Sequence, residues 1–120
     1  MRAASTFPQI YICRTFVDFR KSIDGLSAVV ETELKLAPFS GALFLFMSRR
    51  RDRVKVLYWD RTGFALWYKR LEEAKFAWPR GRDLESDVVT MTSEQLEWLL
   101  SGVDVWKIKA HAPLIYEKTS

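Results

Sequence analysis

The chain has 120 residues with a formal net charge of +4, and 48% of them are hydrophobic. This length and composition exclude a disordered basic tail and predict one domain over residues 1–120, with a core of about residues 9–104 and an apolar tail at 105–120. Cys13 and His111 are the only residues of their types, which excludes an internal disulfide, a thiolate zinc cluster and a multi-histidine metal site, so we expect no cofactor and no metal.

The N-terminal segment has no targeting pattern. Residues 1–8 contain one arginine and no apolar stretch of the kind that a secretory signal needs. Farther along, no apolar run approaches the roughly 20 residues that a membrane-spanning helix requires. We therefore expect a cytoplasmic protein with no membrane partner.

A strand and a helix are predicted next. Residues 10–13 are short, apolar and β-prone, as is typical of a strand. From about Arg20 to Lys35 the apolar residues recur at helical spacing, with Asp18 as the candidate N-cap. Gly25 lies inside this pattern and is expected to permit close approach of the helix to a sheet.

The central part of the chain predicts an antiparallel meander. Glycine at the end of the loop 61–63 suits the positive φ of a bulged hairpin. The expected segments are an apolar run at 43–48, a turn at 49–52, and strands at 53–60, 64–71 and 75–78.

The C-terminal part predicts a short strand and a helix. Residues 88–91 are compatible with one more strand, and Thr92 to Gln95 have the form of a capping box, so a helix is expected from Ser93 with Gly102 as its stop. The apolar tail either packs back on the sheet or meets a partner. The expected fold class is α+β, with an antiparallel β-meander sheet packed against an N-terminal helix and a short C-terminal helix.

Positive charge is concentrated in residues 49–82. The segment contains eleven basic and four acidic residues, a net charge of +7, so the rest of the chain sums to −3. A field of one sign beside aromatic rings favours a polyanionic partner over a small neutral substrate. The basic residues are Arg49, Arg50, Arg51, Arg53, Lys55, Arg61, Lys69, Arg70, Lys75, Arg80 and Arg82.

Strand alternation predicts how this charge is displayed. If Asp60 pairs with Phe64, Lys55 lies opposite Lys69 and Leu57 opposite Trp67. One face would then carry cations for phosphates and rings for bases, although a register shift of one residue would scatter the set. The alternative is that the rings are core residues and the lysines solvated. The expected nucleic-acid-binding residues are Arg49, Arg50, Arg51, Arg53, Lys55, Trp59, Trp67, Lys69 and Arg70. Arg70 fits least, because strand alternation places its side chain on the face opposite to that of Lys69.

The sequence contains no recognisable catalytic constellation. It has no nucleophile elbow and no Gly-rich phosphate loop. A small metal-dependent nuclease using Asp52 and Asp60 is a remaining alternative, but no spacing among the acids marks a metal site. We therefore expect a protein that is not an enzyme.

Several blocks of the sequence resemble one known family. Val17 to Leu26 is similar to its Asp-Met-Arg-Lys-x-hydrophobic-Asp-Gly-Leu signature, with Phe19 in place of the usual Met, and position 61 is Arg where glycine is common. Further blocks match in order at 38–44, 50–60, 63–72, 76–79 and 96–104. The family is the accessory protein, often called TnpB, of bacterial insertion sequences of the IS sixty-six family, and it is distinct from the RNA-guided nuclease of the same name.

The resemblance implies a role in DNA transposition beside a separate, larger transposase that carries the catalytic acids. The leading hypothesis is therefore a non-enzymatic accessory factor that binds DNA, in particular the element ends, through the basic aromatic sheet and turn. The alternative is a module that docks the transposase without contacting DNA, using Trp98, Val105 and Trp106. Both faces of the meander are partly apolar, with Phe44 and Phe46 on one and Leu43 and Leu45 on the other, and a homodimer is a further hypothesis.

Overall fold

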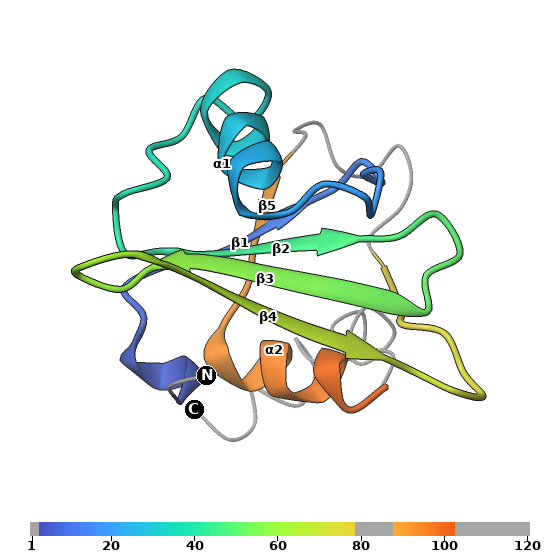
Figure 1. The fold of residues 1–120 in the computed structure, drawn as a ribbon. Coiled ribbons are helices and arrows are strands. Elements are labelled where there is room, and N and C mark those ends of the chain that lie inside the picture. The colour runs from blue at the N-terminus through green and yellow to red at the C-terminus, as the bar shows by residue number, and fades with distance from the viewer. Residues whose placement is uncertain (1–2, 79–87, 103–120) are drawn as a thin grey trace.

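The computed structural model describes residues 3–78 and 88–102, in which a single sheet carries helices on both faces (Figure 1). The strand order across the sheet is β4-β3-β2-β1-β5. In chain order the elements are η1 (Ala4–Thr6), β1 (Ile10–Cys13), α1 (Ile23–Thr32), β2 (Leu43–Met47), β3 (Arg53–Trp59), β4 (Phe64–Arg70), β5 (Val88–Thr90) and α2 (Ser93–Leu100).

The α+β class is confirmed, but the sheet is mixed rather than purely antiparallel. β2, β3 and β4 form the expected antiparallel meander. β1 pairs in parallel with β2, with Ile10 opposite Leu43, because α1 carries the chain across one face of the sheet between the two strands. β5 then adds an antiparallel edge beyond β1.

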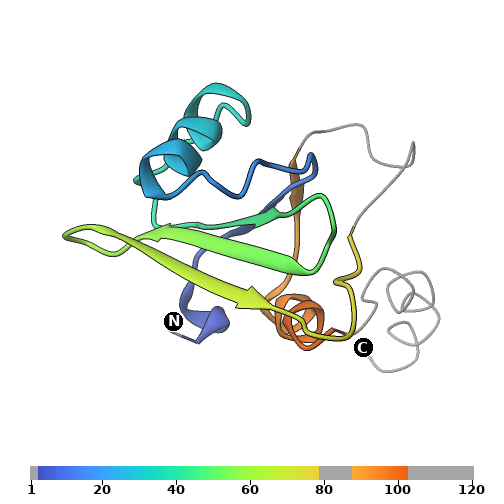
Figure 2. The ribbon, with the colours of Figure 1, turned by 45° about the vertical axis from the view of Figure 1, so that its right-hand side comes forward.

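Both faces of the sheet are covered within the chain (Figures 1 and 2). All five residues of β2 are buried. Phe44 and Phe46 pack in a core with Leu26 of α1, whereas Leu43 and Leu45 pack on the other face in a core that includes residues of α2 and η1. These two cores account for the apolar residues on both faces of β2, and the homodimer stays a hypothesis.

Helix α1 begins later than expected. Ser22 is its N-cap residue and makes no side-chain capping bond, so the expectation that Asp18 caps the helix is wrong. Asp18 instead accepts a hydrogen bond from the backbone N–H of Arg20 and closes a local turn before the helix. Gly25 approaches a side chain rather than the sheet, since a Cβ there would lie 3.1 Å from Cβ of Lys21.

The strand expected at 75–78 is absent. The Phe76 N–H donates to the Arg51 carbonyl oxygen in the β2–β3 turn, and the side chains of Phe76 and Trp78 are buried in the core that contains α2. Because the side chains of Phe76 and Trp78 are buried in this core, the segment does not pair with β4 as a further strand. β4 remains an edge strand.

Helix α2 begins at Ser93, as its capping box predicts. The Thr92 hydroxyl accepts from the Gln95 N–H at 3.1 Å, and the Gln95 side-chain oxygen accepts from the Thr92 N–H at 2.9 Å. Leu96 and Leu99 are fully buried against the sheet. The apolar tail lies outside the described residues. In the part of the chain that the structure describes, no helix is long and apolar enough to cross a membrane.

Candidate nucleic-acid interface

The β3–β4 hairpin has a different register from the one expected. Trp59, not Asp60, lies opposite Phe64, so the loop contains four residues rather than three. Its left-handed residue is Arg61, with φ of 55°, whereas Gly63 has no positive φ. The positive φ expected at Gly63 is therefore wrong, and the strand register differs from the expected one by one residue, a shift that moves each partner to the other face.

The single basic aromatic face consequently does not form. Lys55 lies opposite Tyr68, and Lys69 lies opposite Val54. Trp67 packs against the core on the α2 side of the sheet. The Lys69 ammonium donates to the Leu100 carbonyl oxygen at 2.8 Å, where a cation satisfies one of the free carbonyls at the end of α2.

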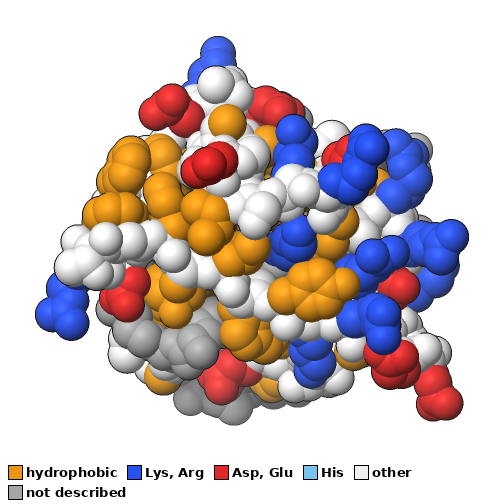
Figure 3. Space-filling model, viewed as in Figure 1, with side chains coloured by type: hydrophobic (Ala, Val, Ile, Leu, Met, Phe, Trp, Pro, Cys, Tyr) orange, Lys and Arg blue, Asp and Glu red, His pale blue; other side chains and the backbone are white. Residues whose placement is uncertain are grey.

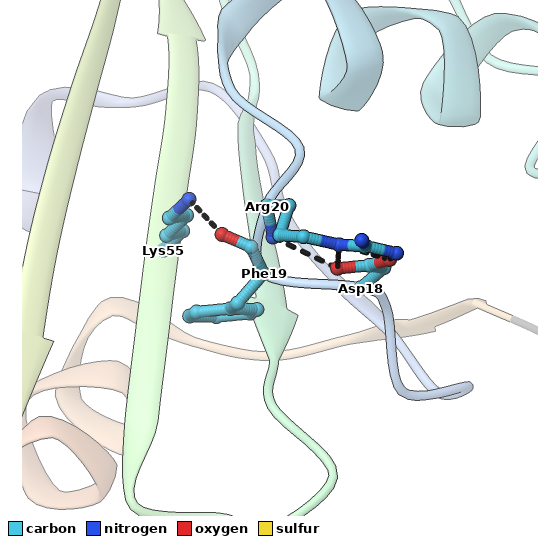
Figure 4. Close-up of polar contacts among 4 residues, drawn as sticks. All are labelled: Asp18, Phe19, Arg20 and Lys55. Atoms are coloured by element: carbon cyan, nitrogen blue, oxygen red, sulfur yellow. Dashed lines mark hydrogen bonds and ion pairs between the residues drawn. The ribbon is translucent and has the colours of Figure 1, made fainter.

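Lys55 is buried on the α1 side and tethers a loop (Figure 4). Its Nζ atom donates to the carbonyl oxygens of Phe19, at 2.9 Å, and Lys21, at 2.7 Å. Nζ also lies 4.9 Å from the centre of the Phe19 ring. Burial lowers the pKa of Lys55, and the positive charge of Arg53 lowers it further. These contacts make Lys55 a structural cation rather than a phosphate ligand.

The tryptophans proposed for stacking or docking are dispersed. Trp59 lies at the far end of β3, where its ring is 5.0 Å from that of Phe39 and 5.1 Å from that of Phe64, measured between centroids. Trp98 is half-buried and packs against the core. Val105 and Trp106 lie outside the described residues.

Arginines instead gather at one end of the sheet, where Figure 3 shows Lys and Arg side chains around the β2–β3 turn. Arg49 and Arg50 are exposed at the turn, and Arg53 at the start of β3 lies directly opposite Arg70 at the end of β4. With Arg20, which lines the same hollow as Arg49, these residues form what we call the arginine end. Its members are Arg20, Arg49, Arg50, Arg51, Arg53 and Arg70.

The turn that carries these arginines is closely hydrogen-bonded. The buried Ser48 donates its N–H to the Arg53 carbonyl and accepts the Arg51 N–H on its own carbonyl. Its hydroxyl oxygen accepts from the Arg53 N–H at 3.2 Å. Arg51 has φ of 62°, a conformation that favours glycine or asparagine. A long cation therefore occupies a position where glycine would fit with less strain.

A hollow of about 590 Å³ lies between this turn and the loop that precedes α1. The loop lies beside the end of β2, because the Val17 N–H donates to the Met47 carbonyl oxygen at 3.1 Å. Four arginines and one carboxylate, Asp18, line the hollow together with Phe16. The Arg20 guanidinium lies 2.6 Å from Asp18, and this hydrogen bond lowers the pKa of Asp18 to about 2.

The charge beside the turn is one-sided. A second hollow, of about 420 Å³, is lined by Arg50 and Lys75 but also by Asp52, Glu72 and Glu73. There the acids outnumber the bases, whereas in the first hollow the arginines outnumber the acid. The positive charge is therefore in excess on the side of the turn that faces Phe16 to Arg20.

Sequence reasoning missed Phe16 and Arg20. They lie about 30 positions before the turn, and no spacing rule relates the two segments. The available signal was the basic character of Arg20-Lys21 directly before the predicted helix. Only the parallel pairing of β1 and β2, which places the β1–α1 loop at the end of β2, brings them to the arginines of the turn.

The acids of the nuclease alternative are far apart. Asp52 and Asp60 flank β3 at its two ends, and a strand rises about 3.3 Å per residue, so roughly 26 Å separates them. One metal ion cannot bridge that distance. Within residues 3–78 and 88–102, no group of three or more His, Cys, Asp or Glu residues is placed to hold a metal.

Comparison with known proteins gives one family. Residues 8–110 match the family described as IS66 Orf2 like protein. Two uncharacterized proteins of Sinorhizobium fredii (strain NBRC 101917 / NGR234) are similar to the chain. y4jC is 35% identical over 101 residues, which cover 84% of each chain. y4hO is 34% identical over 99 residues, covering 82% of this chain and 83% of its own. No solved structure matches significantly.

Proposed function

The chain belongs to the IS66 Orf2-like family of insertion-sequence accessory proteins, and from this premise we propose that it binds nucleic acid at its arginine end. The family supports an accessory role in transposition. In the role that we propose, the protein holds DNA at the element ends while a separate transposase performs the strand chemistry. We assign the protein itself no catalytic step.

The observation that carries the proposal is the arrangement of Arg49 and Arg50. Both are exposed and adjacent on an ordered turn, and among the described residues neither forms an ion pair with an acid. Neighbouring like charges repel one another unless an anion lies between them. Because Ser48 anchors the turn from below, the two guanidinium groups are presented without the cost of ordering a flexible loop.

The arginine end suits a phosphate backbone better than a single small anion. Arg20, Arg53 and Arg70 extend the basic surface beyond the turn onto three other segments, the loop before α1, β3 and β4. One guanidinium group can donate two parallel hydrogen bonds to the oxygens of one phosphate. Each phosphate of duplex DNA that is neutralised contributes about −0.9 to the slope of the logarithm of the binding constant against the logarithm of salt concentration. Contacts by several arginines would therefore make binding weaken steeply with salt.

Fluorescence anisotropy with labelled element-end DNA and a scrambled duplex, across a salt series, tests this proposal. The variant Arg49→Ala/Arg50→Ala is compared with Lys35→Ala/Arg61→Ala, which removes two exposed charges outside the arginine end. Only the first pair should reduce affinity markedly and lower the salt slope by about two units. The ratio of the affinities for the two duplexes shows whether the protein recognises the DNA sequence.

Two outcomes would contradict the proposal. Absence of wild-type binding to either duplex, with the protein folded, would remove the nucleic-acid role and favour docking of the transposase. An equal loss in both double variants would show that net charge alone matters, and that the arginine end is no specific surface.

A further inference from the structure

We infer that the hollow between the loop Phe16 to Arg20 and the β2–β3 turn takes one unstacked nucleotide, with its phosphate on the arginines and its base on Phe16. This inference rests on the proposed function, because the nucleotide belongs to the nucleic acid held at the arginine end. It goes beyond that function by specifying an unpaired nucleotide. The protein would then distinguish a frayed or extended end from a blunt one.

The size of the hollow agrees with such a ligand. Its volume of about 590 Å³ falls within the roughly 300–1,000 Å³ of sites that bind small molecules, so it has room for a base, sugar and phosphate. It is too small for a duplex. A duplex would contact the rim, and only a nucleotide released from the stack could enter.

The arginines supply a phosphate site on one wall. The Arg53 Nε atom is buried without a hydrogen-bond acceptor, and its nearest carboxylate oxygen, on Asp52, is 3.6 Å away. Arg49 and Arg50 line the same wall and have no acidic partner among the described residues. Arg20 differs, because it is paired with Asp18. The phosphate therefore fits best against the turn, with Arg20 closing the opposite side.

Phe16 supplies a flat apolar surface beside these cations. Its side chain is 41% exposed and lines the hollow. Phe39 is more exposed, at 60%, but its ring is packed against Trp59 and Phe64. Among the described residues, the Phe16 ring makes no ring–ring contact of the kind that holds Phe39. An exposed ring within a cationic hollow is the combination that proteins use to stack a base beside its phosphate.

The wall that carries Phe16 is held in place before any ligand arrives. The Val17 N–H donates to the Met47 carbonyl oxygen of β2, and the Lys55 ammonium donates to the Lys21 carbonyl oxygen. Lys55 also donates to the Phe19 carbonyl oxygen (Figure 4). Asp18 and Arg20 close the turn between these anchors. Each constraint lowers the entropy that binding would otherwise have to remove.

The test compares a short blunt duplex with the same duplex extended by one unpaired nucleotide, both labelled for anisotropy. Wild type should bind the extended duplex about 5-fold or more tightly than the blunt one, since one stacked base contributes roughly 1–3 kcal/mol. Phe16→Leu keeps an apolar side chain but removes the ring, and should abolish this preference. Phe39→Leu makes the same chemical change at an exposed ring near the other end of β3 and should retain it.

The outcomes separate this inference from the proposed function. Equal binding of the two duplexes by wild type would overturn the nucleotide site while leaving the nucleic-acid role intact. A preference that persists in Phe16→Leu would also overturn it, because the base would then lie elsewhere. Absence of binding to both duplexes would overturn both proposals. Preference in wild type and in Phe39→Leu, but not in Phe16→Leu, would establish the site.

Discussion

The Nζ atom of Lys55 lies 2.9 Å from the carbonyl oxygen of Phe19, a residue 36 positions earlier in the chain. A buried cation from the middle of the sheet thus fixes the loop that forms one wall of the arginine-lined hollow. Desolvation of the ammonium opposes this arrangement, and two charge-assisted hydrogen bonds together with the Phe19 ring offset it. The loop is therefore anchored to the sheet through its backbone, while the side chains of Phe16 and Arg20 stay exposed.

Lys55→Met should destabilise the protein by about 1–3 kcal/mol, because the two carbonyl groups lose their donor while the side-chain volume is largely kept. Urea unfolding measures the change. The preference for an unpaired nucleotide should weaken in parallel, since Phe16 is no longer held. A variant as stable as wild type, with the same preference, would show that the tether is dispensable.

The pKa of Lys55 gives this prediction a pH signature. In the folded state the pKa lies below its usual 10.5, so the unfolded chain binds more protons between the folded value and 10.5. Stability contributed through Lys55 therefore rises with pH across that window. Wild type should gain stability relative to Lys55→Met as alkaline pH is approached, and a difference that is constant with pH would contradict the shift.

The elements that could be predicted from sequence are those with local signals. Thr92 and Gln95 form the capping box that their spacing indicates, and the apolar run at 10–13 is β1. The central position of β2, between β1 and β3, is indicated by its composition. All five residues of β2 are apolar, which is typical of a central strand covered on both faces rather than of one half-buried meander strand.

The candidate site could be predicted only in part, because it depends on register and on long-range contacts. The positive φ expected at Gly63 lies at Arg61. The register expected from that loop differs by one residue from the observed one, and this difference assigned Lys69 to the wrong face. The cluster Arg49 to Arg51 needed no register and was identified directly. Arg20 joins it through a loop whose path is determined by β1, α1 and Lys55, which no local pattern encodes.

Arg51→Gly and Arg61→Gly form a matched pair that separates strain from binding. Both arginines have positive φ, at 62° and 55°, where a side chain costs about 1–2 kcal/mol, partly offset by the extra chain entropy of glycine. Each variant should therefore be more stable by roughly 0.5–1 kcal/mol in urea unfolding.

Only Arg51→Gly should weaken nucleic-acid binding, with a salt slope lower by about one unit, because Arg61 lies at the other end of β3. Equal affinities of the two variants would exclude Arg51 from the interface. A loss of stability in either would show that the side chain makes contacts that outweigh its strained backbone.

Lys69→Met tests the reassignment of Lys69 from phosphate ligand to helix cap. Loss of the bond to the Leu100 carbonyl should cost about 0.5–1.5 kcal/mol of stability, seen as an earlier urea transition. Affinity for the blunt duplex and its salt slope should be unchanged, because the ammonium is directed to α2. A lower salt slope with unchanged stability would restore Lys69 to the nucleic-acid surface.

Asp18→Asn should strengthen nucleic-acid binding. The substitution removes the one carboxylate in the arginine-lined hollow and releases the Arg20 guanidinium, while the amide oxygen can still accept the Arg20 N–H that closes the turn. We expect a several-fold gain in affinity at low salt and a steeper salt slope, measured by anisotropy. Unchanged binding would mean that no phosphate approaches Arg20.

The same substitution should alter acid sensitivity in a defined direction. Since the pKa of Asp18 is lowered from 3.8 to about 2 by its hydrogen bonds to Arg20, its stabilising contribution is complete above pH 3.8 and is lost as pH falls through 2. Wild type should therefore lose stability relative to Asp18→Asn across that interval, as followed by circular dichroism. Because both side chains are exposed, the effect should shrink in high salt. If wild type and Asp18→Asn lose structure at the same acid pH in low salt, the Asp18–Arg20 ion pair does not persist in solution. The affinity gain expected from releasing Arg20 should then be absent as well.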